Sequence, residues 1–296
     1  MRFTAEEDSS FDGRSPFRVG EGSPFTALAY AKAPAMVAAA SPVWLYGFNA
    51  SGSGDRTQTF TNTVHSATAT ASFDVTKIGI FTTSDSLTFV ATGADTWSRQ
   101  RDNLFGITNF DSNSPSGSGT LAYTNGGFSA DFTGTASWTR VTAIGLAIGV
   151  PADSSSATYT GNVQYKYDLP YAFFFEPTVG VSYTETYTAN FGTKTGDMTE
   201  VHGGARIGTE MKWMGYTIQP TLSGAVFKIV DYSPAVAASV SDQLGGRGSA
   251  KINVIWTPNF SSWIEAHGSG IAGTKTLGNL STNTYGASGG LRYSWY

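Results

Sequence analysis

Hydrophobic and polar positions alternate along much of the chain, and most regularly in residues 158–188. From 159 to 169 every second residue is aromatic, aliphatic or glycine and the residues between them are polar, and 175–187 repeats the pattern except at Glu185. This period of two is that of a β-strand. Each arm is about 12 residues long, whereas a soluble strand usually has ~5–6 residues and a tilted strand that crosses a bilayer needs ~9–11. The stretch therefore predicts a transmembrane β-hairpin, with a large soluble β-sandwich as the alternative.

Twelve segments with strand-like character follow one another after residue 42. They are residues 43–50, 68–81, 86–97, 118–123, 128–139, 158–168, 173–186, 201–213, 216–230, 249–256, 262–271 and 285–295. The second segment changes phase near Lys77, which would suit a β-bulge or a misplaced boundary. The seven tryptophans all lie near segment ends, where amphipathic rings would meet the membrane interface: Trp44, Trp97, Trp138, Trp213, Trp256, Trp263 and Trp295.

The connections between these segments alternate strictly between long and short. The long ones are 51–67, 98–117, 140–157, 187–200, 231–248 and 272–284, and the short ones are 82–85, 124–127, 169–172, 214–215 and 257–261. Asn125-Gly126 lies in a short one and is a strong hairpin indicator. Outer-membrane barrels have short periplasmic turns and longer extracellular loops. The sequence therefore predicts an all-β fold, a 12-stranded antiparallel transmembrane β-barrel whose first strand starts, and whose last strand ends, in the periplasm.

Residues 1–41 differ from the rest, so we divide the chain into a linker, 1–41, and a barrel, 42–296. Residues 1–24 are polar and rich in glycine and serine, while the alanine-rich 25–40 could form a short helix broken at Pro34 or remain a flexible tail. The start, MRFTAEEDSS, has no apolar stretch of the kind found in a signal peptide. We therefore expect either a C-terminal piece of a longer protein or a true start further upstream.

Composition narrows the function classes. Only 14% of the residues are charged and 14% are aromatic, against a usual ~25% charged. No run of 18 apolar residues occurs, so no transmembrane helix is expected. The net charge of -4 gives no reason to expect nucleic acid as a partner, and the absence of cysteine excludes disulfides and thiolate metal ligands. We see no metal constellation and no glycine-rich phosphate loop, and we expect no cofactor.

Seven charged residues fall on the polar faces of the predicted strands, and we expect them to face the lumen. They are Lys166, Glu176, Arg206, Glu210, Lys212, Glu265 and Arg292. Because both signs are present, they could pair with one another or simply solvate the lumen. His202 belongs to the same face as Arg206, whereas His65 falls in a predicted extracellular loop.

Several motifs resemble the translocator domain of classical monomeric autotransporters, the type V secretion proteins. The C-terminal TYGASGGLRYSWY resembles the family's last strand, FEPTVGVSY (175–183) a mid-barrel strand, and GGARIGTEMKWMGYTIQPTLSGAVF (203–227) the strand pair that follows. ALAYAKAPAMVAAASPVWLYGFNASGSGD (27–55) is similar to the approach to the first strand in a subgroup of the family. The resemblance covers about 270 residues through short, degenerate motifs.

The resemblance implies a function and a location. The barrel would lie in the outer membrane of Gram-negative bacteria as a monomer, export or anchor an N-terminal passenger at the cell surface, and hold residues 1–41 in its lumen. Its partners would be outer-membrane lipid, lipopolysaccharide, the barrel assembly machinery and its own passenger. The assembly signal would be Leu291, Tyr293, Trp295 and Tyr296, although Tyr296 lies one residue beyond the family's terminal aromatic. No Asn-Asn pair occurs, so self-cleavage of the family's kind is not supported.

Two alternatives remain open. A porin-like passive channel would need an open, charged constriction. A lipid-acting hydrolase would use His267 and Ser269, since a His-x-Ser strand motif occurs in outer-membrane phospholipase A and in lipid A deacylases, where the histidine serves as base for the serine. Here the motif reads HGSGIAG, without the Asn-Gly that follows the serine in the phospholipase, and it is expected to face the lumen. We therefore expect no catalytic residue and no enzymatic activity.

Overall fold

A computed structural model describes residues 2–4, 29–31, 44–59, 62–102, 108–145, 153–234, 243–271 and 282–295 of the chain. Twelve long strands make up most of it. They are β3 (Trp44–Gln58), β4 (Asn62–Ile78), β5 (Asp85–Asp102), β6 (Thr108–Asn125), β7 (Phe128–Gly145), β8 (Ser154–Tyr165), β10 (Phe173–Thr188), β11 (Lys194–Thr209), β13 (Tyr216–Pro234), β14 (Gln243–Thr257), β15 (Phe260–Ile271) and β16 (Thr282–Trp295). The predicted number of strands is confirmed.

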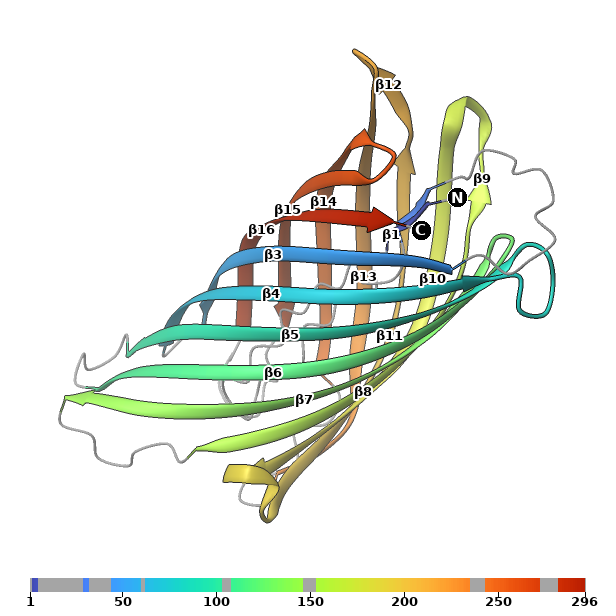
Figure 1. The fold of residues 1–296 in the computed structure, drawn as a ribbon. Helices are drawn as coiled ribbons and strands as arrows, with labels where there is room; N and C mark the ends of the chain where they lie inside the picture. The colour runs from blue at the N-terminus through green and yellow to red at the C-terminus, as the bar shows by residue number, and fades with distance from the viewer. Residues whose placement is uncertain are drawn as a thin grey trace.

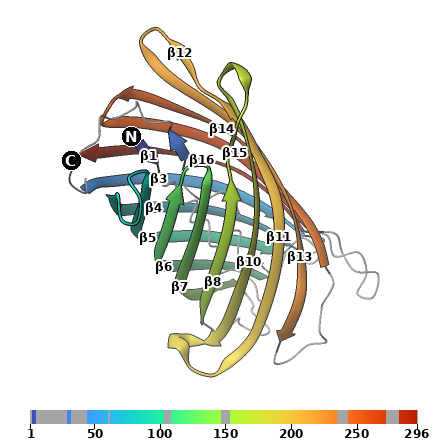
Figure 2. The same cartoon turned by 90° about the vertical axis from the view of Figure 1, so that its right-hand side faces the viewer.

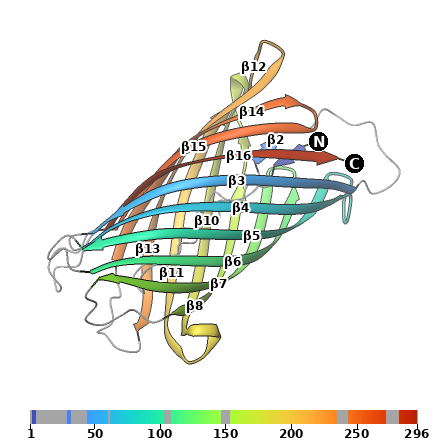
Figure 3. The ribbon, with the colours of Figure 1, turned by 60° about the vertical axis from the view of Figure 1, so that its left-hand side comes forward.

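The strands close into a barrel in which every neighbouring pair is antiparallel. Each long strand pairs with the next along the chain, β11 with β13 among them, and the last strand, β16, pairs with the first, β3, from Asn283↔Gln58 to Trp295↔Tyr46. Closure leaves no unpaired sheet edge, which a membrane-spanning sheet requires. β3 to β8 form one wall of the barrel (Figure 1 and Figure 3), and β10, β11 and β13 form the opposite side (Figure 2).

Short elements extend the hairpins at the end where β3 begins and β16 ends. β9 (Tyr167–Asp168) pairs with β10, and β12 (Met211–Trp213) pairs with the start of β13 and projects beyond the wall (Figure 1). A one-turn 3-10 helix, Pro170–Ala172, precedes β10 at this end, and a second one, Ala189–Phe191, connects β10 to β11 at the opposite end. The β12–β13 turn has positive φ at both Met214 and Gly215, as a type I′ turn requires.

The turn predicted at Asn125-Gly126 is shifted by one residue. Asn125 pairs with Phe128, so Gly126 and Gly127 are the two central residues, and Gly126 has a positive φ of 59°. Near Lys77 the pairing runs without a register shift and β4 ends at Ile78, so the phase change there marks a misplaced boundary rather than a bulge.

At the end of the barrel opposite to the start of β3, the observed strands are longer than the predicted segments. The long connection expected at 51–67 is mostly strand, since β3 continues to Gln58 and β4 starts at Asn62. The same extension occurs at β6, which begins at Thr108 rather than 118. The hairpins at this end carry polar residues on both faces, so the apolar alternation that predicts a membrane strand fades there although the backbone pairing continues.

Residues 1–41 are described only at β1 (Arg2–Thr4) and β2 (Ala29–Ala31), which pair with one another in an antiparallel ladder. The described part of the alanine-rich segment is therefore strand where a helix was considered. The rest of residues 1–41, and with it their predicted passage through the lumen, lies outside the described residues. So does Tyr296, the last residue of the predicted assembly signal.

The side chains of the wall are arranged inside out relative to a soluble protein. Large apolar side chains are exposed on the outer face, with Val179 62%, Val226 64% and Ile264 65% accessible. Serine, threonine, asparagine and charged side chains fill the buried positions between them. An exposed apolar belt of this kind is stable only against an apolar solvent. No helix of the described residues is long and apolar enough to cross a membrane.

Aromatic side chains border the outer belt at both ends. Trp97 and Trp138 lie towards one end, and Trp44, Trp213, Trp256 and Trp295 lie towards the other, all of them exposed. Trp263 was predicted to join them, but it is only 5% exposed. It alternates with the outward Ile264 and so lies on the inner face of β15. Lys251 Nζ lies 4.4 Å from the centre of its ring, so this tryptophan contacts a cation inside the barrel rather than lipid.

Candidate functional site: the barrel lumen

The inner faces of β4 to β8 carry mostly serine and threonine, and we name this arc the hydroxyl wall. Its hydroxyl groups bond to each other across neighbouring strands. The pairs are Thr68–Thr96 at 2.8 Å, Thr76–Thr88 at 2.9 Å, Ser114–Thr139 at 3.0 Å, Thr120–Thr133 at 2.8 Å and Ser137–Ser156 at 2.8 Å. Because β-branched residues suit strands and a hydroxyl both donates and accepts, these pairs satisfy each other within the wall.

The remaining inner surface, from β10 through β16 to β3, carries most of the buried charges, and we name it the ionic wall. Glu176 and Arg206 lie opposite each other on β10 and β11, and one guanidinium nitrogen donates to both carboxylate oxygens at 3.0 and 2.9 Å. Both side chains are nearly inaccessible. Lys166 lies nearby, 3.4 Å from Asp168 and 5.0 Å from the centre of the Phe174 ring, which Arg206 also approaches.

Arg292 forms an ion pair that crosses the closing seam of the barrel. It donates from β16 to Asp74 on β4 at 2.8 Å, so the pair spans β3, which lies between those two strands. Gly47 of β3 lies beneath it, and a Cβ at that position would collide with both side chains. Both members are 4% exposed. The seam is therefore held by an ion pair as well as by the backbone ladder.

A longer polar chain runs across β7, β8, β11 and β14. Asn162 donates to Asp131 at 2.9 Å, and its carbonyl oxygen lies 2.8 Å from His202 Nε2. His202 Nδ1 lies 3.2 Å from Glu200, which in turn accepts from Arg247. The Asn162–His202 bond passes over Gly180 of β10, where a Cβ would overlap both side chains. This chain connects the hydroxyl wall to the ionic wall.

His267 takes part in a third bond that skips a strand. Its Nε2 lies 2.6 Å from Asp55 Oδ1, across Gly286 of β16, where a Cβ would again collide with both. Ser269 follows two residues later on the same face of β15. The His-x-Ser pair thus lies on the face opposite to the exposed Ile264, which belongs to the lipid-facing belt.

The other predicted lumen residues lie in different surroundings. Glu265 is half-buried and opposite Lys251 in the β14–β15 register. Glu210 and Lys212 lie in the projecting β12–β13 hairpin and are exposed, with Glu210 accepting a bond from Gln219 at 3.3 Å. His65 is not in a loop, as was predicted, but on β4, where it is exposed on the outer face.

Six further charged residues of the inner face were not predicted from the sequence: Asp55, Asp74, Asp131, Glu200, Arg247 and Lys251. Parity alone could have placed Asp131 and Lys251, which alternate with apolar neighbours. Asp55 fell in a predicted loop, and Asp74 lay in the segment whose phase was ambiguous. Among the described residues no cluster of three or more His, Asp or Glu is arranged to hold a metal ion.

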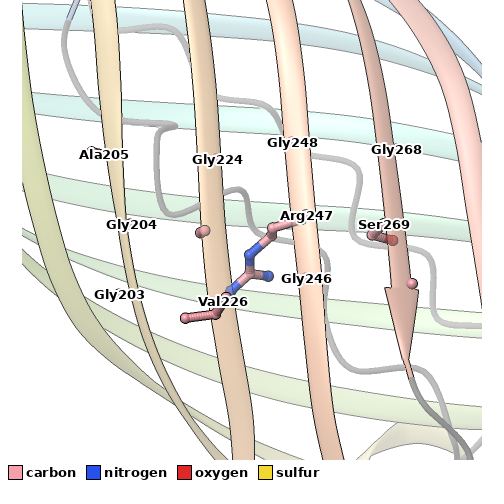
Figure 4. Close-up of a pocket in the computed structure, with 12 residues that line it drawn as sticks. Gly203, Gly204, Ala205, Gly224, Val226, Gly246, Arg247, Gly248, Gly268 and Ser269 are labelled. Atoms are coloured by element: carbon pink, nitrogen blue, oxygen red, sulfur yellow. The ribbon is translucent and has the colours of Figure 1, made fainter.

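Glycine dominates one part of the wall at mid-height. A hollow of about 810 Å³ is lined there mostly by glycines of four neighbouring strands, and Arg247 and Ser269 are also among its lining residues (Figure 4). The register explains the cluster, since Gly224 pairs with Gly248 and Gly246 with Gly270. Small residues leave the wall thin at this position.

The C-terminal strand presents its predicted assembly residues to the outside. Leu291, Tyr293 and Trp295 are 54%, 52% and 36% exposed and pair with Ala50, Phe48 and Tyr46 of β3. Trp295 also stacks on Tyr46 with ring centres 6.1 Å apart. The outer side of the closing seam is therefore an aromatic cluster, while its inner side is the Asp74–Arg292 pair.

A closed 12-stranded barrel with an apolar outer belt and a polar interior is an outer-membrane β-barrel, and the chain is located in the bacterial outer membrane. No protein-family model matches the sequence, and no curated protein is similar to it in sequence. Solved structures are similar to it in fold.

The β domain of the Bordetella autotransporter BrkA has a TM-score of 0.65 at 16% identity, covering 84% of this chain and 99% of that one. The transport unit of the autotransporter AIDA-I from Escherichia coli has a TM-score of 0.54 at 13% identity, covering 85% of this chain and 90% of that one. The translocator domain of NalP from Neisseria meningitidis has a TM-score of 0.53 at 10% identity, covering 84% and 88%. The predicted resemblance to autotransporter translocator domains is thus confirmed for the fold.

Proposed function

We propose that this chain is a translocator that exports, or anchors at the cell surface, a passenger joined to its N-terminus. The observation that carries the proposal is the hydroxyl wall, whose hydrogen bonds are already made between neighbouring side chains. A polypeptide in transit would meet a polar surface with few unpaired donors to trap it. The similarity to three translocator barrels supports the same assignment.

We infer the orientation from the two ends of the barrel. β3 begins and β16 ends at one end, and the hairpins at the other end extend into polar segments. With the chain ends in the periplasm, a segment before β3 that passes through the lumen would deliver its own N-terminus outside. Residues 1–41 would be that segment and residues 42–296 the barrel.

The test places a signal peptide and an epitope tag ahead of residue 1 and adds protease to intact cells. Loss of the tag, while the barrel stays in the membrane, is the expected result. Survival of the tag until the outer membrane is opened would leave the N-terminus in the periplasm and contradict export. In that case a porin-like passive channel is the better explanation. The planar-bilayer conductance of the barrel should then be the same with and without residues 1–41.

We further propose that the barrel is not a lipid hydrolase, because His267 and Ser269 lie on the inner face of β15, opposite to the exposed Ile264 and away from lipid. Lipase activity of the purified barrel should be indistinguishable from that of a His267→Ala variant. A selective loss of hydrolysis in the variant would contradict this.

We also propose that the barrel assembly machinery recognises the outer face of β16. Trp295→Ser should reduce the amount of heat-modifiable, folded barrel in cells, whereas deletion of Tyr296 should reduce it much less, because Trp295 occupies the seam. Equal loss in the two variants would indicate that the terminal position itself, and not Trp295, is read.

A further inference from the structure

Basic side chains gather on the outer face of β3, β4 and β5, at the end opposite to the chain ends. Arg56 pairs with His65, and His65 pairs with Arg99, so the three lie side by side across three strands. Arg101 follows two residues further along β5 on the same face. All four are exposed, and we name them the outward basic patch. Neighbouring strands are ~4.8 Å apart, so the first three Cα atoms span roughly 10 Å.

Only part of this charge is neutralised within the wall. Arg99 donates to both oxygens of Asp111, at 2.8 and 3.1 Å. The guanidinium of Arg56 lies 5.9 Å from the centre of the Tyr285 ring, which leaves its edge free to donate. Among the described residues Arg56 and Arg101 have no carboxylate partner, and the next carboxylate down the outer face of β5, Asp95, accepts from Asn113 at 2.6 Å. The patch therefore retains positive charge.

Another outward cation on the barrel shows what a neutralised site looks like. Lys194 at the start of β11 lies 2.8 Å from Glu185 and 2.7 Å from Asp197, and also donates to Tyr183 at 3.0 Å. Two carboxylates thus surround one ammonium group. The basic patch has the opposite balance, three arginines against Asp111, so it is built to meet anions from outside the chain.

The height of the patch indicates which anions those are. Trp97, two residues nearer the middle of β5, is 48% exposed on the same face, as expected for a ring at the membrane interface. The patch therefore lies just beyond the hydrocarbon, at the level of lipid headgroups. Arginine binds phosphate through two parallel N–H donors. Several arginines close together on the outer wall therefore attract anionic headgroups.

We propose that the outward basic patch binds the phosphate groups of a glycolipid of the outer leaflet, of the lipid A type. This inference rests on the proposed orientation of the barrel but not on passenger export. Arg56 and Arg101 are the principal phosphate ligands, and Arg99 is partly held back by Asp111.

The test measures binding of purified bisphosphorylated lipid A to the refolded full chain in detergent, by native mass spectrometry. The wild type should retain the lipid, and dephosphorylated lipid A should bind about tenfold more weakly or worse, because the headgroup contacts are lost. Arg56→Gln/Arg101→Gln should weaken binding by a similar factor. Lys194→Gln is the matched control and should stay within about twofold, because that lysine is already surrounded by carboxylates.

Asp111→Asn adds a gain-of-function arm, since it releases Arg99 and should tighten binding by about twofold to fivefold. Equal affinity for the phosphorylated and dephosphorylated lipids would overturn the proposal, and so would an equal effect of the double variant and Lys194→Gln. Complete displacement by excess inorganic phosphate would show a simple anion site rather than a glycolipid site and would also overturn it. The comparison of the two lipids uses the wild type alone, so it does not depend on how the variants fold, and tag shaving tests passenger export separately.

Discussion

Around the lumen, β4 to β8 present hydroxyl groups to one side, and the arc from β10 round to β3 presents most of the buried charges to the other. Each hydroxyl pair joins neighbouring strands, as Thr120 and Thr133 do at 2.8 Å. Some charged and amide pairs also join neighbouring strands, as Glu176 and Arg206 do, but others skip a strand, as Asp74 and Arg292 do. The contacts that reach beyond the next strand are thus made by charged and amide groups, and the hydroxyl pairs stay local.

The difference has an energetic consequence. A neutral hydrogen bond contributes about 0.5–1.5 kcal/mol, and a hydroxyl that loses its partner often finds another in a wall full of them. A buried charge that loses its partner costs about 3–5 kcal/mol, because it remains desolvated. We therefore expect the hydroxyl wall to tolerate substitution and the ionic wall to be sensitive to it.

The largest effect is expected at the seam. Arg292→Met should destabilise the barrel by about 3–5 kcal/mol, because Asp74 would be left buried without its cation. Unfolding in urea from lipid vesicles, followed by tryptophan fluorescence, measures the loss. The double variant Asp74→Asn/Arg292→Met should recover most of it, because no buried charge remains. If the double variant is as unstable as Arg292→Met alone, packing of the arginine stem, and not its charge, holds the seam.

A smaller effect is expected at the glycines over which the long bonds pass. Gly180→Ala should cost about 1–3 kcal/mol, since a Cβ there overlaps both Asn162 and His202 and forces their bond apart. Gly224→Ala is the matched control, because nothing lies within 4 Å of a Cβ at that outward position. The same urea titration compares them. Similar losses in the two variants would mean that glycine is needed for strand flexibility rather than for the bond above it.

Much of this architecture could be predicted from sequence, and the omissions have a common cause. The lipid-facing belt imposes a strict alternation, so strand number, strand order and the ends near the chain termini follow from pattern alone. Beyond the belt both faces are polar, and Arg56 and His65 were therefore assigned to a loop although they lie on strands.

The pairing of inner charges depends on the register two strands away, which the alternation does not encode. Arg292 was expected to face inwards, yet its partner Asp74 becomes apparent only when β16 closes on β3. Trp263 was placed at the membrane interface because it lies near a strand end. Its position in the alternation of β15 points inwards, and this position determines where the ring lies.

The smallest effect separates the two walls most directly. Thr120→Val removes one hydroxyl of the Thr120–Thr133 pair while keeping the shape of the side chain, and we expect a loss of about 0.5–1.5 kcal/mol. Ser118 and Thr135 lie next to this pair on the inner faces of the same strands, so Thr133 has other hydroxyls within reach. A loss as large as that of Arg292→Met would contradict this, because it would mean that the hydroxyl wall acts as one cooperative network. In that case its hydrogen bonds, and not the ion pairs alone, would set the stability of the closed barrel.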